Sequence, residues 1–138
     1  MSTRTLLFLA GSFAVAASAA LGNPASPAAN GRAIFLTGRD LAGHRIAAVP
    51  RPLYPACVAC HRASGAGGVH LPGGAVSADL RHRTLAHLKP AYTPALLERA
   101  ISTGIDNEGK PLGHVMPRWR MSKADLHDVA AYVWTTLK

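Results

Sequence analysis

The chain has 138 residues and a mass of 14.4 kDa, enough for one domain with a core large enough to fold. We do not expect a second domain at this length. The chain carries 15 Lys and Arg against 7 Asp and Glu, a formal net charge of +8, and it has two cysteines.

Residues 1–20 have the composition of a secretory signal peptide. Arg4 precedes an uncharged stretch rich in Leu, Phe, Ala and Val, and small residues follow at 17–19. We expect cleavage near Ala19 or Ala20 and a periplasmic protein. The alternative is an uncleaved anchor, but the apolar run is short for a membrane span and is interrupted by glycine and serine. No cysteine stands at the cleavage point, so a lipoprotein is not indicated.

The mature chain is basic. Loss of Arg4 leaves 14 Lys and Arg against 7 Asp and Glu, a formal net charge of +7. No later segment is apolar for long enough to cross a bilayer, so we expect a soluble exported protein. Such a protein suits an acidic protein partner or, for peripheral association, an anionic membrane surface. Nucleic acid is a poor fit, because the chain has an export signal and no clustered basic helix.

The segment after the signal predicts a leader and then a domain. Residues 21–29 are rich in proline and alanine, and we expect a flexible leader there, followed by one domain over residues 30–138. Residues 30–38 predict a short helix with an apolar side formed by Ala33, Ile34 and Leu36 and an end at Gly38. Residues 38–56 contain three prolines and no sustained period, so they predict a loop.

The stretch CVACH at residues 57–61 holds both cysteines. A disulfide in so small a ring would constrain the unfolded chain little. A thioredoxin-like redox pair needs a strand and helix pattern that this sequence lacks. A zinc site would need a further ligand at a favourable spacing, and there is no second cysteine pair.

C-x-x-C-H is also the attachment motif of c-type haem, and this interpretation accounts for every residue in it. The spacing lets Cys57 and Cys60 reach the two vinyl groups of one porphyrin, and it carries His61 beneath the ring to bind the iron. The glycine-rich residues 61–80 that follow are consistent with backbone pressed against a flat cofactor, or equally with a mobile surface loop.

The opposite face of the iron needs a second ligand, and Met116 is our candidate. Its thioether suits an electron carrier, the following proline stiffens the backbone, and the segment is a loop far from Cys57 in sequence. His114 is the nearest rival, and Met121 borders the next helix and could simply pack. The other candidates are ordinary surface histidines in our interpretation: His44, His70, His82, His87 and His127.

Two further helices have clear end signals. The first has Thr93 as N-cap, Pro94 at its first position and Gly104 after its end. The last begins at Ser122, which forms a capping-box-like pair with Asp125. Apolar residues recur along the last helix at spacings of three and four and predict one buried face: Leu126, Val129, Ala130, Val133 and Leu137.

With CVACH, the MPRW segment that contains Met116 and the terminal helices, the chain resembles a monohaem class I c-type cytochrome over most of its mature length. Its sequence is similar to those of periplasmic cytochromes and of cytochrome subunits of dehydrogenases and oxidases. The resemblance implies an all-α fold, a small helical domain with long loops wrapped around one covalently bound haem.

The resemblance also implies two contacts. Gly31 and Phe35 of the first helix should cross Val129 and Tyr132 of the last, since glycine allows a close approach. A proline carbonyl should hold the axial histidine, and Pro72 is the candidate. One departure is the length of the segment between the first helix and the haem motif, which is almost absent in the family's smallest members.

Three functions are compatible with these residues. A six-coordinate iron has no open position, so the first is an electron carrier between redox proteins. The second is a haem enzyme such as a peroxidase, in which Met116 would detach or not bind. The third is a dedicated cytochrome subunit of a dehydrogenase or oxidase complex. Basic residues that flank the Met116 side could steer an acidic partner: Lys89, Lys110, Arg118, Arg120 and Lys123.

Overall fold

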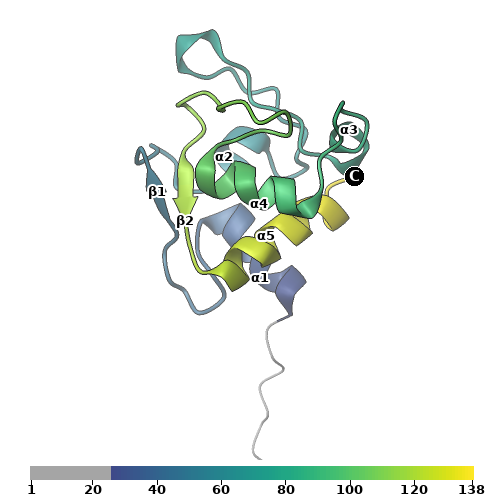
Figure 1. The fold of residues 1–138 in the computed structure, drawn as a ribbon. Helices are drawn as coiled ribbons and strands as arrows, with labels where there is room; N and C mark the ends of the chain where they lie inside the picture. The colour runs from purple at the N-terminus through teal and green to yellow at the C-terminus, as the bar shows by residue number, and fades with distance from the viewer. Residues whose placement is uncertain (1–25) are drawn as a thin grey trace, which may run out of the picture.

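A computed structural model of the chain describes residues 26–138. The predicted signal peptide, residues 1–20, and the leader residues 21–25 lie outside the described residues. The elements are α1 (Pro27–Thr37), β1 (Ala47–Val49), α2 (Val58–His61), a 3-10 turn η1 (Pro72–Gly74), α3 (His82–Leu85), α4 (Pro94–Thr103), β2 (Arg118–Arg120) and α5 (Lys123–Thr136). The fold is a small helical domain with long loops (Figure 1), which confirms the predicted class.

Helix α1 begins earlier than the sequence predicted. Ser26 is its N-cap, with the side-chain oxygen accepting a hydrogen bond from the backbone N–H of Ala29 at 3.2 Å, and Pro27 is in the first turn. The prediction of a leader over residues 21–29 is therefore wrong for residues 27–29. Serine followed by proline is a helix start signal, because the hydroxyl satisfies a free N–H and proline lacks one. The end at Gly38, with φ +66°, is as predicted.

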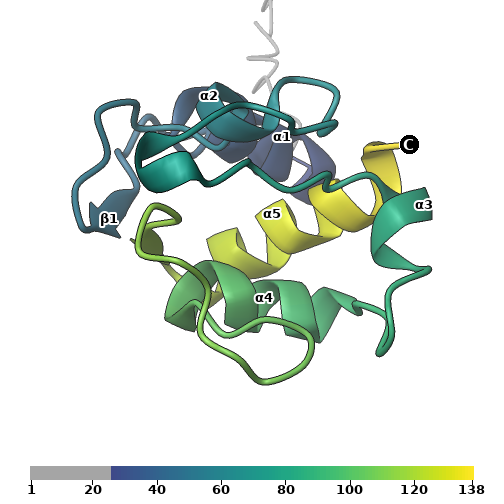
Figure 2. The same ribbon diagram turned by 90° about the horizontal axis from the view of Figure 1, so that it is seen from above.

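Helices α1 and α5 cross closely, as the resemblance implied. A Cβ on Gly31 would lie 2.1 Å from the backbone oxygen of Asp128, so only glycine fits there. Phe35 packs on Tyr132 with ring centroids 5.5 Å apart. Figure 2 shows α5 between α1 and α4, and α5 contacts both helices. The buried core lies along α5, where Val129 and Ala130 have almost no exposed surface.

The capping predictions for the two later helices are confirmed. The Thr93 hydroxyl oxygen accepts from the N–H of Leu96 at 3.2 Å, and α4 ends at Gly104. At the start of α5, the Ser122 hydroxyl oxygen accepts from the N–H of Asp125 and donates to its carboxylate. These signals are local, so a few neighbouring residues are enough to predict them.

The segment 38–56 is not wholly a loop. β1 pairs with β2 in an antiparallel ladder, with Ala48 opposite Trp119, and this two-stranded sheet ties the segment to the residues after Met116. The prediction of a continuous loop there is wrong, because a three-residue strand that pairs with a distant partner has no periodic signature. Within residues 26–138, none of the helices has the length and apolar character needed to cross a membrane.

Candidate haem site

The haem-attachment motif forms one helical turn. Cys57 precedes α2, and the backbone N–H of His61 donates to the carbonyl of Cys57 at 2.9 Å. Cys57 and Cys60 are both free thiols and both partly buried. A turn of helix presents residues 57, 60 and 61 together, so the two thiols and the imidazole can reach one flat ligand.

The environment of Cys57 differs from that of a redox-active cysteine. Burial raises the pKa of the Cys57 thiol to about 12. Thioredoxin-like pairs instead lower the pKa of the attacking thiol so that it ionises near neutral pH. Among residues 26–138, no three His, Cys, Asp or Glu side chains gather into a group that could hold a metal ion. The raised pKa of the Cys57 thiol therefore does not match that of the attacking thiol in a thioredoxin-like pair.

His61 is held in the state that an iron ligand requires. It is 8% exposed, and its Nδ1 lies 2.9 Å from the backbone oxygen of Ala78. Because a carbonyl oxygen only accepts, Nδ1 carries the proton and Nε2 keeps its lone pair. Burial also lowers the pKa of His61, which favours the neutral ring.

The carbonyl that orients His61 is not that of Pro72. Pro72 stands at the start of η1 and is exposed, whereas the carbonyl that accepts the hydrogen bond from His61 Nδ1 belongs to Ala78, six residues later. The role that the resemblance gave to Pro72 is therefore filled by a different residue.

The glycine-rich loop is tied to the motif by hydrogen bonds. Buried Ser77 donates to the carbonyl of Cys60 at 2.7 Å and accepts from the N–H of Val69 at 2.9 Å. Gly67, at φ +61°, lies so close to Ala78 that a Cβ would stand 2.3 Å from its carbonyl oxygen. A side chain at residue 67 would push away the same oxygen that orients His61.

The other six histidines are exposed, unlike His61. Two of them pair with carboxylates, His44 with Asp40 at 2.8 Å and His127 with Glu98 at 3.0 Å. His114 is exposed in the segment between α4 and β2.

Met116 is partly buried and packs against the core, in the loop 104–117 between α4 and β2. Its N–H donates to the carbonyl of Gly113 at 3.1 Å. In Figure 2, α2 lies on the side of α1, and α4, which leads into this loop, lies on the other side of α5. Met121 packs against the core as well, so this packing is common to both methionines, and the simple packing role of Met121 stays a prediction.

A hollow of about 300 Å³ lies between the segment leading to the motif and the segment that follows Met116. Its lining includes Arg45, Arg51 and Trp119. The indole Nε1 of Trp119 is buried and has no hydrogen-bond partner among the described residues. Buried polar atoms are nearly always paired, so this N–H is suited to an acceptor supplied by a ligand. The two carboxylates of a haem are such acceptors, and the residues present fit the group.

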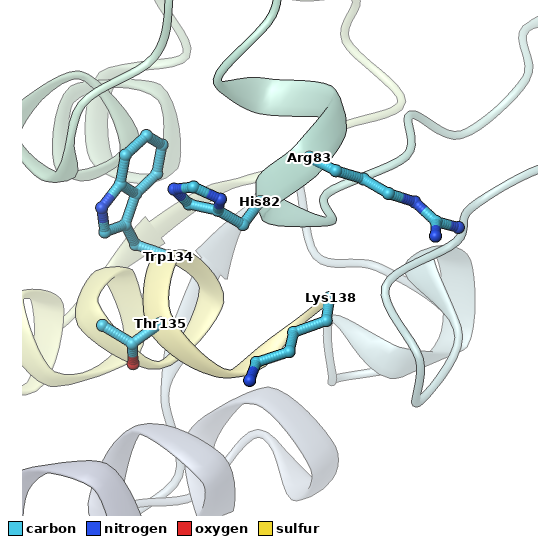
Figure 3. A pocket seen from close by; sticks show the side chains of 5 residues that line it. All are labelled: His82, Arg83, Trp134, Thr135 and Lys138. Carbon is cyan, nitrogen blue, oxygen red and sulfur yellow. The ribbon is translucent and has the colours of Figure 1, made fainter.

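A second cavity, of about 480 Å³, lies between α3 and the C-terminal end of α5. Figure 3 shows the His82 ring standing against Trp134, with centroids 4.4 Å apart, while Arg83 points away. None of its lining residues belongs to the haem motif or to the Met116 loop.

Fold and site together define a small all-α domain built to carry one covalently attached haem. The Cytochrome c family model matches residues 28–137, and the chain therefore belongs to the cytochrome c family. Cys57 and Cys60 are the attachment residues of its haem c, and haem-based electron transfer is its activity. No curated protein and no solved structure matches the chain significantly.

Sequence reasoning missed Ser77, the Ala78 carbonyl and Trp119 as parts of the site. Backbone oxygens have no residue signature, and a serine in a glycine-rich loop is unremarkable. Trp119 could have been found from the sequence, because it follows the Met116 loop and a buried indole N–H needs a hydrogen-bond acceptor.

Proposed function

We propose that this cytochrome is a periplasmic single-electron carrier in which His61 and Met116 bind the iron from opposite faces. The haem, when bound, supplies a one-electron iron couple. Residues 1–20 act as the export signal, and the mature chain accepts and donates electrons between redox protein partners. With both axial positions filled by protein, only the electron passes through the site.

The observation that carries this proposal is the hydrogen bond from His61 Nδ1 to the Ala78 oxygen. It leaves Nε2 as the free nitrogen of a neutral imidazole, which is the form that binds a metal. Met116 supports the proposal because its thioether is the ligand type that suits an electron carrier and Pro117 stiffens the backbone directly after it.

The ligand set and the burial point to a raised reduction potential. An imidazole and a thioether are both neutral, so the ferric site carries one more positive charge than the ferrous site. A site with little water disfavours the more charged state. Arg45, Arg51 and Trp119 would receive the haem carboxylates, which keeps those charges paired.

Two alternatives are separable by experiment. In a peroxidase-like enzyme the sixth position must open to substrate, which the packing of Met116 against the core opposes. A dedicated subunit of a dehydrogenase or oxidase complex would use the same electron transfer but would copurify with its complex.

The test uses the holoprotein purified from periplasm. Haem should stay on the denatured chain in a gel stained for haem peroxidase activity, and Cys57→Ala with Cys60→Ala should abolish the stain.

The ferric protein should show the weak long-wavelength band of a methionine-to-iron bond. Met116→Ala should remove that band and lower the potential, whereas Met121→Ala should change neither. Ready binding of carbon monoxide by wild-type protein without the band would favour the enzyme.

A further inference from the structure

Arg118 follows Met116 by two residues, and its guanidinium donates hydrogen bonds to backbone carbonyls of the Met116 loop. It donates to three backbone carbonyls of the loop, with Nη2 2.7 Å from the oxygen of Leu112 and Nη1 3.4 Å from the oxygen of Gly113. Nη1 also donates to the oxygen of Met116 itself. The guanidinium carries five N–H donors in a fixed planar fork, whereas an ammonium is a point charge on a flexible stem, so only the fork fixes the carbonyls it binds in one relative arrangement.

The space for this guanidinium is provided by Gly104. A Cβ at Gly104 would lie 1.8 Å from Nε and 2.0 Å from Cζ of Arg118. Gly104 also accepts from the N–H of Leu112 at 2.7 Å, so the C-terminal end of α4 and the Met116 loop meet around the Arg118 side chain. The loop is thus held in two ways, by the hydrogen bonds from Arg118 and by the hydrogen bond between Leu112 and Gly104.

We propose that Arg118 is the positioning residue of the axial methionine, holding the loop 104–117 closed so that the Met116 sulfur stays on the iron. This inference rests on the proposed His61 and Met116 ligation. Arg118 does not touch the iron in this scheme. It acts through the Met116 carbonyl, by limiting how often the loop opens.

The consequence is measurable as competition for the iron. An external ligand such as imidazole can bind ferric haem only when the methionine sulfur leaves. Its apparent affinity therefore reports the fraction of time for which the loop is open. A hydrogen bond to a charged group contributes enough that losing it should shift this equilibrium about tenfold or more.

The experiment compares the ferric holoproteins of wild type, Arg118→Gln, Arg118→Lys and the control Arg120→Gln. Arg120 lies on the same strand and is exposed, so its change removes a charge without touching the loop. We expect Arg118→Gln to bind imidazole about tenfold more tightly or better, with a weaker methionine band. Arg118→Lys keeps the charge but loses the fork and should also bind more tightly, and Arg120→Gln should match wild type.

A second pair tests the same contact without altering Arg118. Gly104→Ala places a methyl group where the guanidinium lies, whereas Gly109→Ala, at φ +85°, has nothing within 4 Å. Both changes impose backbone strain at a left-handed position of the loop. Only Gly104→Ala should weaken the band and raise imidazole affinity. This pair decides the matter if the arginine variants fail to fold.

The outcomes separate the two proposals. If wild type has the band and Met116→Ala removes it, the ligation holds. An imidazole affinity of Arg118→Gln within about twofold of wild type then overturns the role of Arg118. Equal behaviour of Gly104→Ala and Gly109→Ala overturns it as well. If wild type lacks the band, the ligation fails and the inference fails with it.

Discussion

Ser77 joins the haem motif to the loop that orients His61. Its hydroxyl donates to the Cys60 carbonyl and accepts from the Val69 N–H, and it is 7% exposed. Ser77→Ala should lower the free energy of unfolding by about 1 kcal/mol, because the carbonyl of Cys60 and the N–H of Val69, both partly buried, lose their partner. Urea unfolding of the holoprotein measures this.

The matched control for Ser77 is Ser64→Ala. Ser64 is exposed, and its only hydrogen bond in the described structure is a long one of 3.4 Å from the N–H of Ala66. A loss at Ser64 as large as that at Ser77 would show that burial of the hydroxyl is not the cause.

Asp79 follows the Ala78 carbonyl and is the centre of a charged hydrogen-bond group. The Arg81 side chain holds the pKa of Asp79 well below its usual range, with a further hydrogen bond from Thr84 at 3.0 Å. Because the pKa of Asp79 is lower in the folded protein than in the unfolded one, its ionised form stabilises the fold at pH values above the unfolded pKa of about 3.9. This contribution is lost as the pH falls through the pKa of the folded protein. Asp79→Asn should therefore cost about 1–2 kcal/mol at pH 7, with the cost shrinking below about pH 4.

The pH series is measured by urea unfolding of wild type and Asp79→Asn, and the difference between them isolates this carboxylate. Glu108→Gln is the control, because Glu108 pairs with Lys110 at an exposed site and should contribute little at any pH. A cost for Asp79→Asn that stays constant down to acid pH would contradict the assignment.

At the scale of elements, the crossing of α1 and α5 sets the frame of the domain. Gly31→Ala would bring a methyl group to 2.1 Å from the Asp128 oxygen and 2.8 Å from the Tyr132 Cβ. Alanine normally favours a helix over glycine by about 1 kcal/mol, so a stabilising change is the default expectation. Here overpacking should dominate and lower the free energy of unfolding by about 1–3 kcal/mol.

The crossing prediction has a control in the same helix. Arg32 is exposed on α1, and Arg32→Ala adds helix propensity without touching α5. Thermal unfolding of both holoproteins should show a lower midpoint for Gly31→Ala and little change for Arg32→Ala. A raised midpoint for Gly31→Ala would mean that the helices can move apart at little cost.

The elements also show what a sequence can predict. Caps at Thr93 and Ser122 depend on neighbours within a few residues, so they were predictable. The pairing of β1 with β2 joins residues far apart along the chain, and three-residue strands leave no pattern. For the site, the motif and His61 were readable, but the Ala78 carbonyl was not, since a backbone acceptor depends on the path of the loop rather than on its residue type.

On the scale of the whole molecule, two of the five basic residues predicted to flank the Met116 side are held by other groups of the chain. Lys110 pairs with Glu108 at 2.5 Å, and Arg118 is bound to loop carbonyls. Three of the cations predicted to flank the Met116 side are exposed and lack an ion pair within the described residues: Lys89, Arg120 and Lys123. We propose that these three attract an acidic partner, and the comparison is with Arg83 and Lys138, which are also exposed and without an ion pair in the described structure.

Electron exchange with an acidic blue-copper protein should therefore depend on where charge is removed. Lys89→Glu with Lys123→Glu should slow the second-order rate about tenfold at low salt, since steering raises association by one to three powers of ten. Arg83→Glu with Lys138→Glu makes the same change in net charge at the cavity of Figure 3, and we expect a smaller effect. Stopped-flow rates measure both.

Salt should remove the difference between these two pairs. The screening length falls from about 30 Å at 0.01 M to about 8 Å at physiological ionic strength, so long-range attraction by the Met116 side is lost. The wild-type rate should fall with salt toward that of Lys89→Glu with Lys123→Glu, while the slow variant changes little. A wild-type rate that is indifferent to ionic strength would show that charge does not steer docking. Equal slowing by both charge-reversed pairs would show that docking is not confined to the side of Lys89 and Lys123.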